Sequence, residues 1–81
     1  MEYENLVHRC SYPISGNDYE ILLYSRPDGT HVAKTAFSPE DVIITDGMAL
    51  HDVLSRHLQL LPLAVSSRNI IQEYRKGLVT P

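Results

Sequence analysis

The sequence predicts an α+β domain in which a three- to four-stranded, mainly antiparallel sheet packs against one main helix, in the order β-β-β-β-α, with a short C-terminal helix. Two observations predict this class. Strand-forming stretches separated by turn residues fill the first half of the chain. Apolar residues then recur at helical spacing over residues 50–61. The 81 residues suit one domain, residues 1–81, with a modest core.

Residues 5–12 form the first expected strand, because their side chains alternate between two faces. One of these faces carries Leu6, His8, Cys10 and Tyr12. The stretch is polar and precedes Pro13, which cannot donate to a sheet ladder, so it suits an edge position. The Ser-Gly-Asn-Asp cluster at residues 15–18 then predicts a turn.

Residues 19–26 form the clearest strand and lead into a hairpin at residues 26–30. Pro27 has no amide hydrogen, so a two-residue Asp28-Gly29 loop lacks a donor for its closing pair. A type I turn with Gly29 in the left-handed region fits instead. The resulting register pairs Arg26 with Thr30, Leu23 with Ala33, Ile21 with Thr35, and Tyr19 with Phe37.

This register sorts the side chains of the hairpin into two faces. The face expected beneath the helix carries Tyr19, Ile21, Leu23, Ala33 and Phe37. The opposite, outer face mixes charged and apolar side chains: Glu20, Leu22, Tyr24, Arg26, Val32 and Lys34. An apolar group rimmed by charge is typical of a protein interface. The expected binding surface therefore consists of Leu22, Tyr24, Arg26, Val32 and Lys34.

A loop at residues 38–41 and a fourth strand at residues 42–45 precede the main helix. The apolar face of that helix carries Leu50, Val53, Leu54, His57, Leu58 and Leu61. Leu54 is expected at the centre of this face, and Met48 is expected to face outward. Asp46 is expected to cap the first turn. Asp52 and Arg56 have the favourable spacing and order for an ion pair on a helix surface.

Pro62 separates the main helix from the rest of the chain. Proline lacks an amide hydrogen and restricts the residue before it, so the helix should end or kink there. The apolar residues that follow predict a second short helix ending at Gly77, which suits the position after a helix. A terminal strand over residues 69–74 is the competing interpretation. A further alternative folds the segment after Pro62 back over the outer face of the sheet.

The composition restricts the class of partner. The formal net charge is −3, so the chain has no general attraction for phosphate backbones. The basic residues near the C-terminal end are only three, Arg68, Arg75 and Lys76. We therefore expect no direct nucleic-acid binding. The single Cys10 suits a reducing compartment. No secretory signal and no apolar stretch long enough for a membrane is recognisable, which favours the cytoplasm.

His57 is the strongest single candidate for chemistry, because it lies on the apolar face of the main helix. It is either a titrating switch or ligand, or, as we expect, a part-buried side chain with one hydrogen-bond partner. His8 and Cys10 point the same way, but structural zinc needs four ligands, so no metal or cofactor is expected. The carboxylates are scattered and no nucleophile or phosphate-loop motif occurs, which predicts that the protein is not an enzyme.

Two short stretches resemble the HicB-type antitoxins. Residues 28–33, Asp-Gly-Thr-His-Val-Ala, look like the hairpin of that family. The family's glycine, its apolar and acidic positions and the start of its helix are matched by Gly47, Leu50, Asp52, Val53 and Leu54. The resemblance covers about residues 18–61 and departs from the family pattern at residues 37–41 and at Ala49. It implies a truncated ribonuclease-H-like fold and a module that masks a small protein partner.

Two functional hypotheses follow from these observations. The first is a non-enzymatic, HicB-like interaction module, antitoxin-like in its action, that binds a protein partner through its sheet or helix surface. The second is a structural homo-oligomer of the cytosol, in which a second copy covers the outer face of the sheet. The first requires a separate partner, whereas the second requires only self-association.

Overall fold

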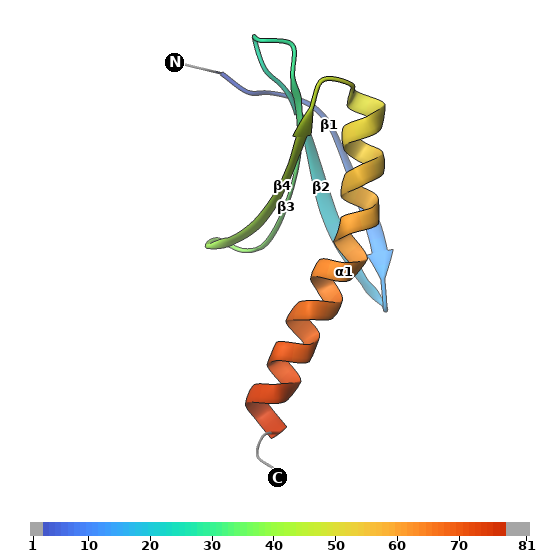
Figure 1. Cartoon of the computed structure of the whole chain (residues 1–81), viewed down its shortest axis with the longest axis vertical. Helices are drawn as coiled ribbons and strands as arrows, with labels where there is room; N and C mark the ends of the chain where they lie inside the picture. Colours follow the sequence, from blue (N-terminus) through green and yellow to red (C-terminus); the bar gives the residue numbers. More distant parts are fainter. Residues whose placement is uncertain (1–2, 78–81) are drawn as a thin grey trace.

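The computed structural model describes residues 3–77 and confirms the α+β class. Four antiparallel strands form one sheet in the order β1-β2-β3-β4, and a single helix follows them (Figure 1). The elements are β1 (Asn5–Ile14), β2 (Asn17–Ser25), β3 (His31–Ser38), β4 (Asp41–Gly47) and α1 (Leu50–Gly77). Because consecutive strands are neighbours, β1 and β4 form the two edges of the sheet.

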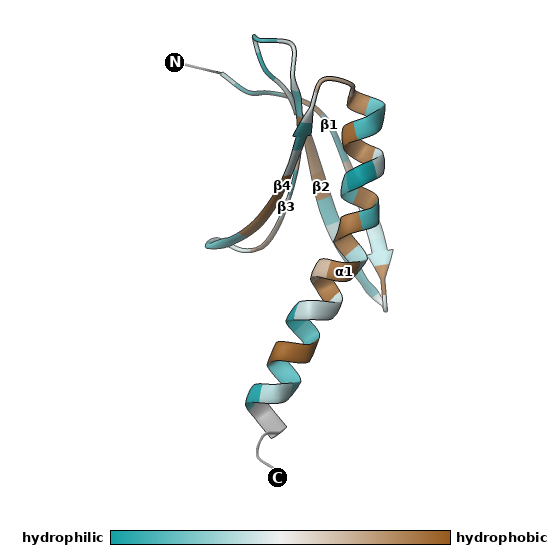
Figure 2. Cartoon of the chain, in the orientation of Figure 1, coloured by the Kyte–Doolittle hydropathy of each residue, from teal (hydrophilic) through white to brown (hydrophobic). Residues whose placement is uncertain are grey.

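The core lies between the sheet and the first part of α1. Its buried members come from β2, β3 and the helix: Ile21, Leu23, Ala33, Val53, Leu61 and Val65. Figure 2 shows that apolar and polar residues alternate along this part of the helix, and Val53, Leu61 and Val65 are the apolar residues buried in the core. We call residues 50–65 the docked half of α1 and residues 66–77 the projecting half, because the second part runs beyond the sheet (Figure 1).

The β2–β3 turn has the predicted geometry. The Arg26 amide donates to the Thr30 carbonyl at 2.9 Å, and the Gly29 amide donates to the Arg26 carbonyl at 3.0 Å. Gly29 has a φ of 91°, in the left-handed region that favours glycine. The Asp28 carboxylate accepts hydrogen bonds from the hydroxyl and amide of Thr30, which lower the pKa of Asp28. The predicted pairing of Leu23 with Ala33 is confirmed.

Strand β1 contains a bulge that the alternation did not predict. Leu6 lies opposite Tyr24, but His8 lies opposite Leu23, so the register shifts between Leu6 and His8. The prediction that these two side chains share one face is therefore wrong, because one extra residue reverses the alternation. The strand also continues past Pro13, which an edge strand tolerates.

Helix α1 begins at Leu50, and Asp46 does not cap it as predicted. Asp46 instead belongs to β4, where it lies opposite Val32 on the outer face. The strand extends two residues beyond the predicted end because its pairing with β3 satisfies those backbone groups. The predicted ion pair between Asp52 and Arg56 is present at 3.2 Å.

The separate short helix after Pro62 is not seen, and neither is the terminal strand, because α1 continues without interruption to Gly77. Its axis changes direction near the middle (Figure 1), which fits the missing hydrogen bond at an internal proline. Leu61 is 0% and Val65 is 4% exposed, so packing on both sides of Pro62 keeps the backbone helical.

The centre of the buried helix face also differs from the prediction. Val53, His57 and Leu61, spaced by four residues, are all 0% exposed. Leu54 is only partly buried and lies beside this row rather than at its centre. Met48 faces outward as predicted, at 70% exposure. The helix is thus rotated about its axis relative to the arrangement inferred from spacing alone.

Candidate functional site

The five residues predicted to form the binding surface lie together on the outer face of the sheet. Leu22 is paired with Lys34, and Tyr24 with Val32, across β2 and β3. Arg26 follows directly at the end of β2. Leu22, Tyr24, Arg26 and Lys34 are partly exposed, whereas Val32 is 0% exposed. Val32 therefore supports this surface from beneath and offers no contact area of its own.

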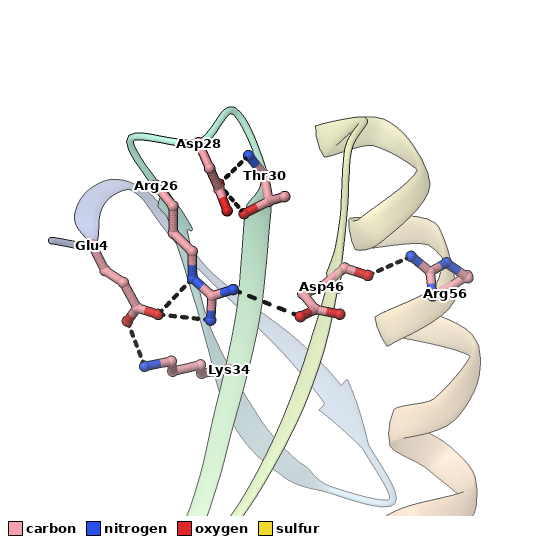
Figure 3. Close-up of polar contacts among 7 residues, drawn as sticks. All are labelled: Glu4, Arg26, Asp28, Thr30, Lys34, Asp46 and Arg56. Carbon is pink, nitrogen blue, oxygen red and sulfur yellow. Dashed lines mark hydrogen bonds and ion pairs between the residues drawn. The ribbon is translucent and has the colours of Figure 1, made fainter. Parts of the chain in front are cut away.

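Charged side chains on the outer face form one connected network (Figure 3). The Glu4 carboxylate accepts from Lys34 Nζ at 2.7 Å and from Arg26 Nε at 3.0 Å. Arg26 also lies 3.7 Å from the Asp46 carboxylate. The hydrogen bond from Lys34 and, after it, the contacts with Arg26 lower the pKa of Glu4. Glu4 thus holds both cations in fixed positions.

The network also orients Tyr24. Lys34 Nζ lies 4.9 Å from the centre of the Tyr24 ring, within the range of a cation–π interaction. The Lys34 ammonium group is held by Glu4 and also lies over the Tyr24 ring, so Lys34 and Tyr24 restrain each other. A surface whose side chains are already ordered loses less conformational entropy on binding.

The prediction missed three apolar residues of the outer face. Leu6, Val42 and Ile44 are 48%, 41% and 55% exposed. Ile44 lies opposite Lys34 on β3, and Leu6 lies opposite Tyr24 on β2. No signal revealed Ile44, because a register shift between Ala36 and Ser38 sets its side: the tight turn at residues 39–40 alone would place Ile44 opposite Thr35 on the inner face. No signal revealed Leu6, since its side is set by the bulge in β1.

A groove of about 470 Å³ runs along the open edge of β4 beside the helix. Its walls come from β4 and α1: Ile44, Thr45, Asp46, Arg56, Gln59, Leu60 and Leu63. Arg56 is fixed here by a 2.7 Å hydrogen bond from Nη2 to the Asp46 carbonyl (Figure 3). The groove thus combines an apolar floor with a charged end.

Arg68, one of the three basic residues near the C-terminal end, is paired with Asp41. Its guanidinium donates to both oxygens of Asp41 at 2.6 and 2.7 Å, and it lies 4.2 Å from the centre of the Phe37 ring. The hydrogen bonds lower the pKa of Asp41 and raise that of Arg68. This contact ties the start of the projecting half of α1 to the β3–β4 turn.

His57 is fully buried, and both of its ring nitrogens have partners. Nε2 lies 2.9 Å from the Thr35 hydroxyl, and Nδ1 lies 2.9 Å from the Thr45 hydroxyl. The expected single partner is thus corrected to two, one on β3 and one on β4. Burial lowers the pKa of His57, so the neutral ring is favoured. The side chain fastens the helix to the sheet and presents no nitrogen to solvent.

His8 and Cys10 are the remaining candidates for chemistry that the sequence offered. His8 and Cys10 lie opposite Leu23 and Ile21, and Cys10 packs against the core. Within residues 3–77, no three histidine, cysteine or carboxylate side chains gather as metal ligands would. In the same part of the chain, α1 is not apolar enough to cross a bilayer.

The comparisons with family models, with curated proteins and with solved structures find no match to this chain. Two surfaces described above therefore carry the functional argument. One is the outer face of the sheet, with its ordered charges around Tyr24. The other is the groove beside β4, one wall of which is formed by α1.

Proposed function

We propose that this chain is a non-enzymatic interaction module of the cytoplasm, with a HicB-like mode of action, that binds a small protein partner on the outer face of its sheet. The observation that carries the proposal is the placement of α1. The helix packs on the inner face, where the core lies, and its projecting half continues past the sheet instead of returning over the outer face (Figure 1). For residues 63–77, the described part of the segment after Pro62, the alternative in which they cover that face is thereby removed.

The chemistry of the outer face supports a protein partner. Tyr24 and Arg26 are of the residue types that most often anchor binding energy at interfaces. Leu6 and Ile44 add exposed apolar area on either side of them. Glu4 orders the cations before any partner arrives, which lowers the entropic cost of binding.

The same network favours a protein over a nucleic acid. Lysine and arginine side chains bind nucleic acid because they neutralise its phosphates and release the counterions condensed on the backbone. Arg26 and Lys34 both already contact the Glu4 carboxylate. Arg68 is likewise held by Asp41. A phosphate backbone would have to displace these carboxylates, and the net charge of −3 opposes its approach.

The second candidate function is a structural homo-oligomer without a separate partner. The shape of the chain favours some form of association, because its radius of gyration is 15.0 Å, against about 11.7 Å for a compact domain of this length. In that case the outer face would meet the outer face of another copy. The two candidates differ in whether Tyr24 contacts a foreign protein or its own counterpart.

The substitution Tyr24→Ala tests both candidates. We expect it to leave the circular dichroism spectrum unchanged and to abolish the capture of a defined partner from the native cell by cross-linking and mass spectrometry. The matched control is Tyr12→Ala, because Tyr12 is 37% exposed and lies on β1, away from this network. Equal capture by Tyr24→Ala and wild type would contradict the outer face as the binding surface. Loss of self-association alone would favour the homo-oligomer.

A further inference from the structure

Large apolar side chains follow the exposed side of α1 in a regular pattern. Leu60 is 41%, Leu63 67%, Ile70 62% and Tyr74 73% exposed. Together with Ser67, these positions are separated by alternating steps of three and four residues, which is the spacing of the contact seam between paired helices. We call these five residues the α1 seam. Single exposed apolar residues are ordinary, but a continuous row marks an interaction site.

The α1 seam is nearly symmetric about Ser67. Leu60 and Tyr74 lie seven residues before and after it, while Leu63 lies four before and Ile70 three after. Two antiparallel copies of the seam therefore place large apolar side chains against large apolar side chains. They meet at the small side chain of Ser67, where the backbones can approach closely. This self-complementarity is what a two-fold homodimer requires.

The groove beside β4 offers a receiving surface for the seam. In an antiparallel pairing about Ser67, Ile70 and Tyr74 of one copy reach the level of Leu63 and Leu60 of the other. Those leucines line the groove together with Ile44 of β4. Tyrosine suits such a site, because its ring can contact the apolar walls while its hydroxyl meets the charged end.

The surface area of the chain is large enough for an interface of standard size. The protein exposes 5650 Å², against about 4,900 Å² for a compact monomer of 9.2 kDa. The excess is close to the roughly 800 Å² that each partner buries in a standard protein interface. Figure 2 shows a strongly apolar band in the projecting half, where no strand of residues 3–77 lies beside it.

We propose that a second copy of this chain covers the α1 seam, so that the projecting half of each helix docks into the groove beside β4 of the other copy. The two helices run antiparallel, and the two-fold axis passes near Ser67. The interface uses the helix side and the β4 edge, where it covers Ile44, and the part of the outer face around Tyr24 and Leu6 stays open. The proposal therefore goes beyond the proposed function and does not depend on it.

Analytical ultracentrifugation of the full chain tests the proposal through Leu63→Glu and Ile70→Glu. We expect wild type to be a dimer, and each variant to raise the dimer dissociation constant at least about a hundredfold, because both protomers carry the change. Both side chains are exposed in the single chain, so folding should be preserved and is checked by circular dichroism. Met48→Glu is the matched control, because Met48 is 70% exposed and lies outside the seam.

A cysteine placed at the two-fold axis tests the helix register. In a Cys10→Ser background, we expect Ser67→Cys to form an intermolecular disulfide under mild oxidation, because the two copies of residue 67 face each other. Asn69→Cys is the control, since Asn69 is also exposed but lies on the other side of the helix. Cross-linking of both variants to the same extent would contradict the antiparallel register.

The remaining outcomes also decide the question. A wild-type chain that stays monomeric up to millimolar concentration would overturn the proposal. So would a dimer that Leu63→Glu and Ile70→Glu leave intact. A dimer that dissociates in Tyr24→Ala but not in Leu63→Glu would place self-association on the outer face and would also overturn it. Loss of partner capture in Tyr24→Ala, with the dimer unchanged, supports both proposals separately.

Discussion

In the docked half of α1, Val53, His57 and Leu61 are completely buried, whereas in the projecting half Ile70 and Tyr74 are more than half exposed. Both halves carry large apolar side chains at helical spacing. The difference lies in what the sheet can reach, because β2, β3 and β4 end before the helix does (Figure 1). Helical periodicity therefore identifies an apolar face, but the length of the neighbouring layer decides whether the chain itself covers that face.

The largest expected effect is on the free energy of unfolding, and it differs between the two halves of α1. Leu61→Ala should lower the free energy of unfolding by about 2–5 kcal/mol, because it leaves a cavity in the core. Ile70→Ala, measured at concentrations where the chain is monomeric, should change it by no more than about 0.5 kcal/mol. Chemical denaturation followed by circular dichroism gives both values. Equal losses would mean that the projecting half is packed within the single chain.

Acidification should act on the docked half through His57. Burial holds the folded-state pKa of this ring below its ordinary value of about 6.5. Above that value both states are neutral and pH has no effect through His57. As the pH falls below it, the unfolded chain takes up the proton first, so stability is lost until the pH passes the folded-state pKa.

Unfolding experiments between about pH 7.5 and 5 isolate this effect, because the paired carboxylates Glu4 and Asp41 stay ionised there. His57→Leu should make the loss of stability shallower. The control is His51→Gln, which removes an exposed histidine of the same helix and keeps His57. Unaltered pH dependence in His57→Leu would show that the ring can accept a proton between Thr35 and Thr45 without cost.

Local chemistry made the β2–β3 hairpin predictable from the sequence. Pro27 and Gly29 restrict the backbone so strongly that the turn type and the pairing of Leu23 with Ala33 follow from them. The outer-face position of Tyr24 and Lys34 follows from the same register. The burial of Val32 does not follow from this register, because it depends on neighbours from other strands as well as on alternation.

Features decided by tertiary contacts were not predictable in this way. Asp46 has the chemistry of a helix cap, but pairing with β3 extends β4 through it. Pro62 predicts that the helix ends or kinks, and burial of Leu61 and Val65 decides between the two, because it keeps the helix continuous while its axis bends (Figure 1). The bulge between Leu6 and His8 has no marker in the sequence, since neither glycine nor proline stands there. At Asp46 and Pro62, strand pairing and packing outweighed local preferences of about 1–3 kcal/mol.

The smallest expected effect concerns the link between the two halves. Arg68 and Asp41 are about one-third and two-fifths exposed, so solvent screens their attraction, and Arg68→Gln should cost only about 0.5–1 kcal/mol. The local consequence should exceed the global one, because the pair is the contact that fastens the start of the projecting half to the β3–β4 turn.

We therefore expect amide hydrogen exchange in residues 69–75 to accelerate in Arg68→Gln while exchange in the docked half stays unchanged. Combining Arg68→Gln with Asp41→Asn should add little further loss, since either change alone breaks the pair. Arg9→Gln is the matched control, because Arg9 pairs with Glu20 across β1 and β2 and should not affect the projecting half. Unchanged exchange at residues 69–75 in Arg68→Gln would mean that the projecting half keeps its order without the sheet, through its own helical hydrogen bonds or through the second copy that covers the α1 seam.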